Sequence, residues 1–286
     1  MTKVVVASLC LAACTEPLGH VERIEGPRVL AARAETDADP ERATPRPGEP
    51  ARVRWLVADP DGTTPRGSLF DVCVVEAGAA AVPVCATPPF ASNTSSPTAT
   101  EPELRFTVPN AATLGQATRL ALLGVVCAGG EATRAGDRYA CAGATDTTRV
   151  SFDVLIGADA FENRNPDLSG TTWTLDGRAW GAGACGGDAP SVVAGGSHAV
   201  AIDLGAAARE TINDGREELL VAHFVTGGEL ARPYSAVAPT EPPRVQLGWD
   251  APSADADGAR EVRLYAVVRD GRGGVSWDMR RVCVTR

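Results

Sequence analysis

Apolar and polar residues alternate with a period of two in several separate parts of the chain. Val53, Trp55 and Val57, for example, are separated by Arg54 and Leu56. The same alternation recurs at residues 104–108, 150–156, 245–249 and 262–268. Successive side chains of a strand point to opposite faces of its sheet, so this pattern predicts half-buried antiparallel strands.

Other segments complete an all-β pattern. Residues 120–127 form a continuous apolar run of strand length, and residues 275–284 form a closing strand after the turn at residues 270–274. Prolines and small polar residues predict loops at 35–50 and 91–102. Residues 206–220 have room for only a helical turn or two, because Asn213-Asp214-Gly215 interrupts them. With a boundary near 157–166, we predict two antiparallel β-sandwich domains, at 27–157 and 158–286.

The start of the chain has the layout of a secretory signal. Lys3 precedes a short apolar stretch at residues 4–11, and Leu11-Ala12-Ala13-Cys14 follows. The stretch is too short to span a bilayer. Its last four residues resemble the bacterial lipobox, which implies removal of residues 1–13 and lipidation of Cys14. Residues 14–26 are then expected to form a lipidated polar tether, and Thr15, which is not Asp, implies the outer membrane by the same resemblance.

Cysteine usage agrees with export. The chain has eight cysteines, of which cleavage removes Cys10 and lipidation consumes Cys14. An even remainder of six predicts a disulfide framework in an oxidising compartment. Fifteen connectivities are possible. Spacing favours the pairs Cys73 with Cys85, Cys127 with Cys141, and Cys185 with Cys283. A zinc site is disfavoured because the chain has no Cys-x-x-Cys pair.

Composition limits the classes of partner. The hydrophobic share of 44% and the charged share of 22% are typical of a globular protein. The formal net charge of −9 argues against a nucleic acid or an anionic lipid surface as the main partner. Lys3 is the single lysine among many arginines, alanines and glycines. A GC-rich genome produces such a bias, so Gly-Ala strings have little value as motifs.

Motifs for catalysis are weak throughout. His20 lies in the expected tether, and His198 and His223 lie in strand-like segments without an H-E-x-x-H or G-x-S-x-G pattern. Ser197 and His198 are neighbours, which on a strand point to opposite faces. Residues 181–186 match G-x-G-x-x-G, but the following Gly187-Asp188-Ala189-Pro190 does not open a helix. We therefore assign no catalytic, cofactor-binding or metal-binding residue and predict that the chain is not an enzyme.

Two ligand-binding alternatives remain open. Asp59-x-Asp61-Gly62 and Asp255-x-Asp257-Gly258 place oxygen ligands for Ca²⁺ on turns, although Asp-Gly is also common turn chemistry. Convergence of Asp59 and Asp61 with carboxylates of the second domain would favour calcium. Trp55 and Trp249 are in phase with apolar neighbours and are expected in the core. Trp173 and Trp180 flank a Gly-rich turn, so an open face bearing both would favour sugar binding.

The second half also resembles a known group of domains. Residues 244–252 (RVQLGWDAP) and 262–274 (VRLYAVVRDGRGG) look like the last strands of bacterial PKD-like and Ig-like domains. The Asn163-x-x-Pro166 opening and the turn at residues 59–62 resemble the same group. The chain as a whole is similar to lipoproteins of myxobacterial-type genomes. The resemblance covers about a third of the chain and implies extracytoplasmic spacer or interaction modules.

These observations lead to one functional expectation and two alternatives. We expect a non-catalytic, lipid-anchored protein of the cell envelope with a structural or interaction role, bound to the membrane through its lipid and to an envelope protein partner. The first alternative is an accessory module that binds carbohydrate or calcium. The second is an unrecognised hydrolase, which requires a cleft that holds His198 or His223 beside an acid and a nucleophile.

Overall fold

A computed structural model describes residues 20–60, 66–74, 85, 88–95, 102–135, 138–158, 162–212, 215–253 and 260–286 of the protein. Within these residues the chain is almost wholly β-sheet. Helical structure is limited to α1 (Ala111–Leu114) and a 3-10 turn at Ala206–Ala208. The prediction of an all-β fold built from antiparallel sheets is confirmed.

The first nine strands form what we call the N-terminal sandwich. Its sheets have the strand orders β1-β2-β5 and β4-β3-β6-β9, and β7 pairs with β8 in a separate hairpin. The strands are β1 (Arg28–Thr36), β2 (Pro50–Ala58), β3 (Arg66–Cys73), β4 (Ala91–Ser95), β5 (Glu103–Thr107), β6 (Arg119–Ala128), β7 (Glu131–Ala135), β8 (Arg138–Ala142) and β9 (Asp146–Leu155).

The remaining strands form the C-terminal sandwich. Its two five-stranded sheets have the orders β11-β10-β13-β19-β17 and β12-β21-β20-β16-β18, and β14 pairs with β15. The strands are β10 (Thr172–Leu175), β11 (Arg178–Ala179), β12 (Ser191–Val193), β13 (Ser197–Asp203), β14 (Thr211–Ile212), β15 (Gly215–Arg216), β16 (Leu219–Val225), β17 (Glu229–Leu230), β18 (Tyr234–Val237), β19 (Arg244–Asp250), β20 (Arg260–Arg269) and β21 (Val275–Thr285). Pairing is antiparallel except between β12 and β21.

The two sandwiches share one strand order. Seven main strands of each run first–second–fifth in one sheet and fourth–third–sixth–seventh in the other. In the C-terminal sandwich these strands are β10, β13, β16, β18, β19, β20 and β21. This order is an immunoglobulin-like arrangement with the fourth strand in the second sheet. The chain therefore contains the same architecture twice.

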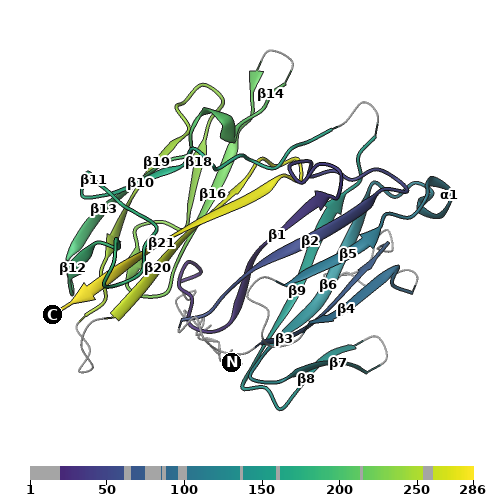
Figure 1. The fold of residues 1–286 in the computed structure, drawn as a ribbon, viewed down its shortest axis with the longest axis horizontal. Helices are drawn as coiled ribbons and strands as arrows, with labels where there is room; N and C mark the ends of the chain where they lie inside the picture. The colour runs from purple at the N-terminus through teal and green to yellow at the C-terminus, as the bar shows by residue number, and fades with distance from the viewer. Residues whose placement is uncertain are drawn as a thin grey trace, which may run out of the picture.

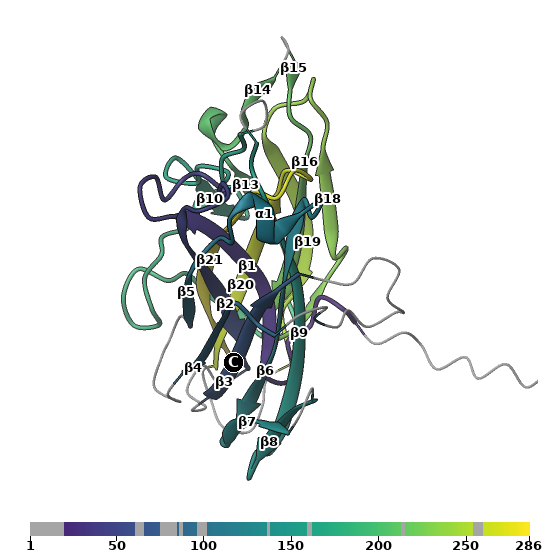
Figure 2. The same ribbon diagram turned by 90° about the vertical axis from the view of Figure 1, so that its right-hand side faces the viewer.

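The sandwiches pack on each other sheet against sheet, so that four sheets lie in successive layers (Figure 1). The inward face of β2 carries Trp55, which stacks on Phe70 of β3 with ring centroids 3.9 Å apart. The outward face of β2 carries Leu56, which joins a buried cluster with Phe224 of β16 and Tyr265 of β20. We call this contact between the β1-β2 and β16-β20-β21 faces the junction. Figure 2 shows the molecule after a quarter turn, with the N-terminal sandwich towards the viewer and the sheets one behind another.

Double burial explains the continuous apolar run at residues 120–127. In β6, Leu120 and Leu122 point into the core of the N-terminal sandwich. Val125 and Cys127 point to the opposite face, which the β7–β8 hairpin covers. A strand that is buried on both faces has no solvent side to require polar residues, so its alternation disappears.

Three segments differ from the predictions. The loop expected at 91–102 begins with strand β4, a polar edge strand that pairs through its backbone with β3. The loop expected at 35–50 begins after Thr36, because β1 continues through that residue. The tether expected at 14–26 ends early, since Ile24 is buried in the junction and its N–H donates to Val225 O at 2.8 Å. A local hydrophobicity pattern does not reveal such long-range backbone pairing.

Candidate functional site

Three disulfides join cysteines of the described residues, and they are the pairs that spacing favours. Two of them lie on the covered outer face of the β4-β3-β6-β9 sheet, where one links β3 to a following segment and one links β6 to β8. The third links the segment between β11 and β12 to the closing strand. The pairs are Cys73–Cys85, Cys127–Cys141 and Cys185–Cys283, with sequence separations of 12, 14 and 98.

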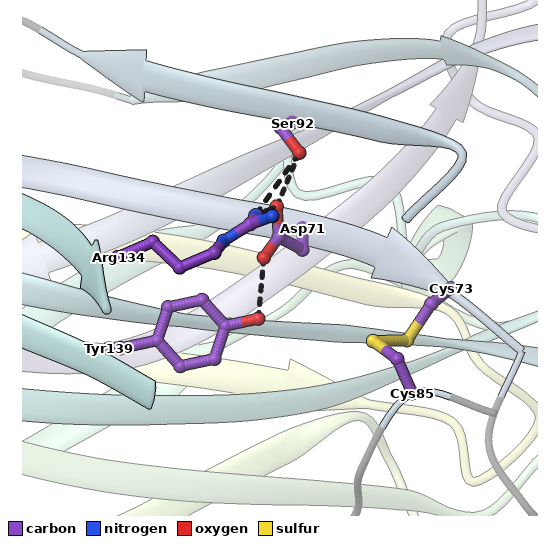
Figure 3. The surroundings of a disulfide bond; sticks show 6 residues. All are labelled: Asp71, Cys73, Cys85, Ser92, Arg134 and Tyr139. Atoms are coloured by element: carbon purple, nitrogen blue, oxygen red, sulfur yellow. Dashed lines mark hydrogen bonds and ion pairs between the residues drawn. A yellow bond between two sulfur atoms is a disulfide. The ribbon is translucent and has the colours of Figure 1, made fainter. Parts of the chain in front are cut away.

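A buried carboxylate holds the β7–β8 hairpin on the sheet beneath it. Asp71 of β3 is 1% exposed and lies close to the Cys73–Cys85 disulfide (Figure 3). It accepts hydrogen bonds from the hydroxyls of Ser92, at 2.5 Å, and Tyr139, at 2.6 Å, and forms an ion pair with Arg134. A buried charge is stable only when it is paired and hydrogen-bonded. The partners all come from the protein itself, so this cluster serves the fold.

A second buried carboxylate lies beside the junction. Glu35 of β1 is fully buried, and Arg52 Nε and Arg54 Nη2 each lie 2.6 Å from its oxygens. Arg33 Nε lies 2.9 Å from the same carboxylate, although its N–H is not aligned for a hydrogen bond. Desolvation by burial lowers the pKa of Arg33. Arg33 also donates across the junction to Ser276 Oγ at 2.8 Å, which connects this cluster to β21.

The segment between the sandwiches is bound to both of them by buried asparagines. Asn165 Nδ2 donates to Ala34 O of β1 at 2.8 Å, and Asn165 Oδ1 accepts from Val275 N of β21 at 2.9 Å. Asn163 Nδ2 donates to Asp270 Oδ2 at 2.8 Å. The Asn-x-x-Pro opening therefore has a structural role, because it ties the first strand of one sandwich to the last strand of the other.

The segment that joins the sandwiches contacts the turn at residues 270–274 of the C-terminal sandwich. Asp270 Oδ1 accepts the backbone N–H groups of Arg272, at 2.7 Å, and Gly274, at 2.9 Å. A Cβ atom at Gly274 would lie 2.1 Å from Asp270 Oδ2 and 2.5 Å from Arg164 O, so only glycine fits there. Arg272 also forms an ion pair with Glu217, a buried carboxylate whose pKa is raised by desolvation. The Asp-Gly-x-Gly-Gly pattern thus holds the segment that joins the two sandwiches against the C-terminal sandwich.

A pocket of about 400 Å³ opens at one end of the junction. We call it the junction pocket. It lies between β1, the segment that joins the sandwiches, and β21, so both sandwiches contribute to its wall. Its lining is mostly polar and consists of Arg33, Glu41, residues 166–169, Thr171, Ser276, Trp277, Asp278 and Arg280.

The histidines do not assemble a hydrolytic site in the described part of the chain. His198 Nδ1 lies 2.8 Å from Asp176 Oδ2, and this hydrogen bond lowers the pKa of Asp176. His198 Nε2 is buried and has no hydrogen-bond partner. His223 Nε2 lies 2.9 Å from Ser235 Oγ, but both residues are buried, and desolvation lowers the pKa of His223 to about 4. Neither histidine has both an acid and a nucleophile beside it.

The tryptophan platform considered for sugar binding is absent at Trp173 and Trp180. The two rings are neighbours, with centroids 5.7 Å apart, but both are buried in the C-terminal sandwich. Their indole N–H groups donate to Asp278 Oδ2 at 2.9 Å and Arg281 O at 2.7 Å. The open face that a platform at these two residues requires is therefore not formed, whereas the carbohydrate alternative itself stays a prediction.

The described residues give little support for a calcium site. Asp59 lies at the junction, where the nearby group of the C-terminal sandwich is the guanidinium of Arg263, 3.5 Å from Asp59 O. Asp61, Asp255 and Asp257 fall outside the described residues. Across the described ranges, no three His, Cys, Asp or Glu side chains are grouped so that they could hold a metal ion.

The predicted lipidation site also falls outside the described residues, which begin at His20, so Cys14 stays a prediction. None of the helices in the described ranges has the length and hydrophobicity to cross a membrane.

Comparison with known proteins gives no family. No family model and no curated protein matches the chain. A crystal structure of dimeric latent PorU from Porphyromonas gingivalis is similar over 91% of this chain at 13% identity and a TM-score of 0.25, and this chain spans 20% of it. A structure of manganese lipoxygenase of Gaeumannomyces graminis with partial zonadhesin of Komagataella pastoris is similar over 90% of this chain and 94% of its own, at 9% identity and a TM-score of 0.19. Scores this low support no argument about function.

Sequence reasoning missed the junction pocket and both buried carboxylates. Trp277 and Asp278 lie in a strand that was predicted, but nothing in the pattern indicates that residues 166–171 cover them. Glu35 falls in a segment predicted as loop. The available signal was weak. Arg52 and Arg54 lie two residues apart and therefore on one face of β2, and Glu35 joins that face only once β1 pairs with β2 and places it opposite Arg52.

Proposed function

We propose that this chain is an exported bacterial lipoprotein, anchored through Cys14, whose two sandwiches form a rigid non-catalytic module at the cell envelope. The three disulfides are the observation that carries the proposal. Disulfides form and persist in oxidising compartments and are rare in the cytosol. A signal-like leader together with this disulfide framework supports a location outside the cytoplasm over a cytosolic one.

The junction supports a mechanical role for the module. Domains of one chain usually move relative to one another unless their interface is large and hydrophobic. Here apolar side chains of four strands are buried at the junction, and Asn165 hydrogen-bonds to the backbone of both sandwiches. A rigid pair of sandwiches is suited to hold a binding surface at a fixed distance from a membrane. We propose an envelope protein as its partner and the outer membrane as its location.

The anchor proposal is tested by membrane fractionation of cells that express the full chain. We expect the wild-type chain in the membrane fraction and extracted only by detergent, because multiple acyl chains give a lasting anchor. Cys14→Ser removes the acceptor thiol and should shift the chain to the soluble envelope fraction or leave its leader uncleaved. Cys10→Ser is the matched control and should behave as wild type. Membrane association that survives Cys14→Ser would contradict the proposal.

A further inference from the structure

We propose that the junction pocket binds a neutral saccharide. The pocket lies where two sandwiches meet, which is a common place for ligand sites, and its volume of about 400 Å³ is within the usual range for small molecules. Both sandwiches contribute to the wall, so the site exists only in the assembled pair. The inference goes beyond the lipid anchor and does not depend on it.

The charges in the pocket do not favour an anionic ligand, because both arginines of the lining are already paired with carboxylates. Arg280 Nη1 lies 2.7 Å from Asp278 Oδ1, and Glu41 is paired with Arg164 at 2.6 Å. Arg33 lies beside the buried carboxylate of Glu35. A charged ligand would need an unpaired counter-charge to offset the loss of its hydration. Among the described lining residues both arginines already lie beside carboxylates and do not supply one for an anion, which disfavours phosphates and other anionic ligands.

The polar groups suit a ligand with many hydroxyls. Ser169 is exposed in the wall, and the half-buried Asp167 accepts the Ser169 N–H at 2.9 Å. Thr171 contributes a second hydroxyl. Each sugar hydroxyl both donates and accepts hydrogen bonds, so it can use carboxylate acceptors, guanidinium donors and protein hydroxyls together.

Trp277 adds the apolar component that a sugar ring requires. The indole N–H groups of Trp173, Trp180 and Trp249 have partners within the fold. Trp277, by contrast, is half-buried and lines the pocket. A ring with an apolar face and a polar edge matches the C–H face and the hydroxyl rim of a pyranose.

The test measures binding of cellobiose and N,N′-diacetylchitobiose to the full chain in detergent, by saturation-transfer NMR and calorimetry, with glutamate as a charged probe. We expect at least one disaccharide to bind with a Kd on the order of 1 mM, and glutamate to bind more weakly. Ser169→Trp fills the pocket from an exposed position and should weaken binding at least about tenfold. Ser197→Trp, on the exposed face of β13, is the matched control and should leave it unchanged.

A second variant separates loss of binding from loss of folding. Trp277→Phe keeps an aromatic ring at the junction, and we expect weaker disaccharide binding with a melting temperature close to that of wild type. The proposal is overturned if neither disaccharide binds, if glutamate binds more tightly, or if Ser169→Trp binds as well as Ser197→Trp. None of these results bears on the anchor, whose own test is the fate of Cys14.

Discussion

Asn165 and Val275 meet across the junction, where the side-chain oxygen of Asn165 accepts the backbone N–H of Val275 at 2.9 Å. The amide nitrogen of the same side chain donates to Ala34 O at 2.8 Å. One buried side chain thus hydrogen-bonds to the first strand of the N-terminal sandwich and to the last strand of the C-terminal sandwich. The relative position of the two sandwiches is therefore set by specific polar contacts as well as by the apolar cluster around them.

Asn165→Ala should loosen this junction. The substitution leaves a backbone N–H and a backbone C=O without their partner in a buried region, which we expect to lower the free energy of unfolding by about 2 kcal/mol. Hydrogen exchange should become faster at β1 and at the start of β21. Asn110→Ala, at the exposed N-cap of α1, is the matched control and should lower stability by about 1 kcal/mol or less. Equal effects of the two variants would contradict the structural role of Asn165.

Burial of His223 makes stability depend on pH. Burial lowers the pKa of His223 to about 4, below the roughly 6.5 expected in the unfolded chain. Between these values the unfolded state binds a proton that the folded state excludes, so stability falls as the pH drops from about 6.5 towards 4. The slope should be about 1.4 kcal/mol per pH unit, as measured by denaturant unfolding across that range. His223→Gln should reduce this dependence, whereas His20→Gln, at an exposed position, should preserve it.

Asp71→Asn should weaken the attachment of the β7–β8 hairpin. The variant removes the charge that Arg134 pairs with, and we expect a loss of about 2 kcal/mol, below the full value for a buried pair because Arg134 is partly exposed. Asp153→Asn breaks an exposed pair with Arg119 and should change stability by about 0.5 kcal/mol or less. The comparison uses urea unfolding of both variants. A similar small loss in both would mean that the Asp71 cluster does not hold the hairpin.

The long disulfide should stabilise the fold more than a short one. Closing a loop of 98 residues restricts the unfolded chain more than closing one of 12, by about 4 to 5 kcal/mol against about 3 kcal/mol on the chain-entropy model. Replacing Cys185 and Cys283 together with serine should therefore lower the midpoint of guanidinium unfolding more than replacing Cys73 and Cys85 together. The opposite order would show that native-state contacts, and not loop length, decide the effect.

Much of the strand pattern was readable from the sequence. Val53, Trp55 and Val57 fill the N-terminal core in the phase that their alternation predicts, and Trp249 is buried in the C-terminal core. The disulfide pairs followed from spacing because the two short pairs are separated by only 12 and 14 residues, which leaves Cys185 and Cys283 for each other. These features depend on local period and chain distance, which the sequence contains directly.

The junction was not readable in the same way. Leu56 interrupts the alternation of β2, and only the sheet of β16 and β20 explains why an apolar side chain lies on that face. The pairing of residues 22–24 with β16 joins segments about 200 residues apart. A single sequence identifies apolar positions, but it does not say which sheet covers an outer face. The pocket at the junction was hidden for the same reason.

Intact mass spectrometry of the native protein, isolated from envelope membranes under non-reducing conditions, tests the central claim most directly. The account predicts a chain that lacks residues 1–13, carries diacylglycerol and an added acyl group at Cys14, and has lost six hydrogens to three disulfides. A chain of unprocessed mass with free thiols, recovered from the cytosol, would contradict it.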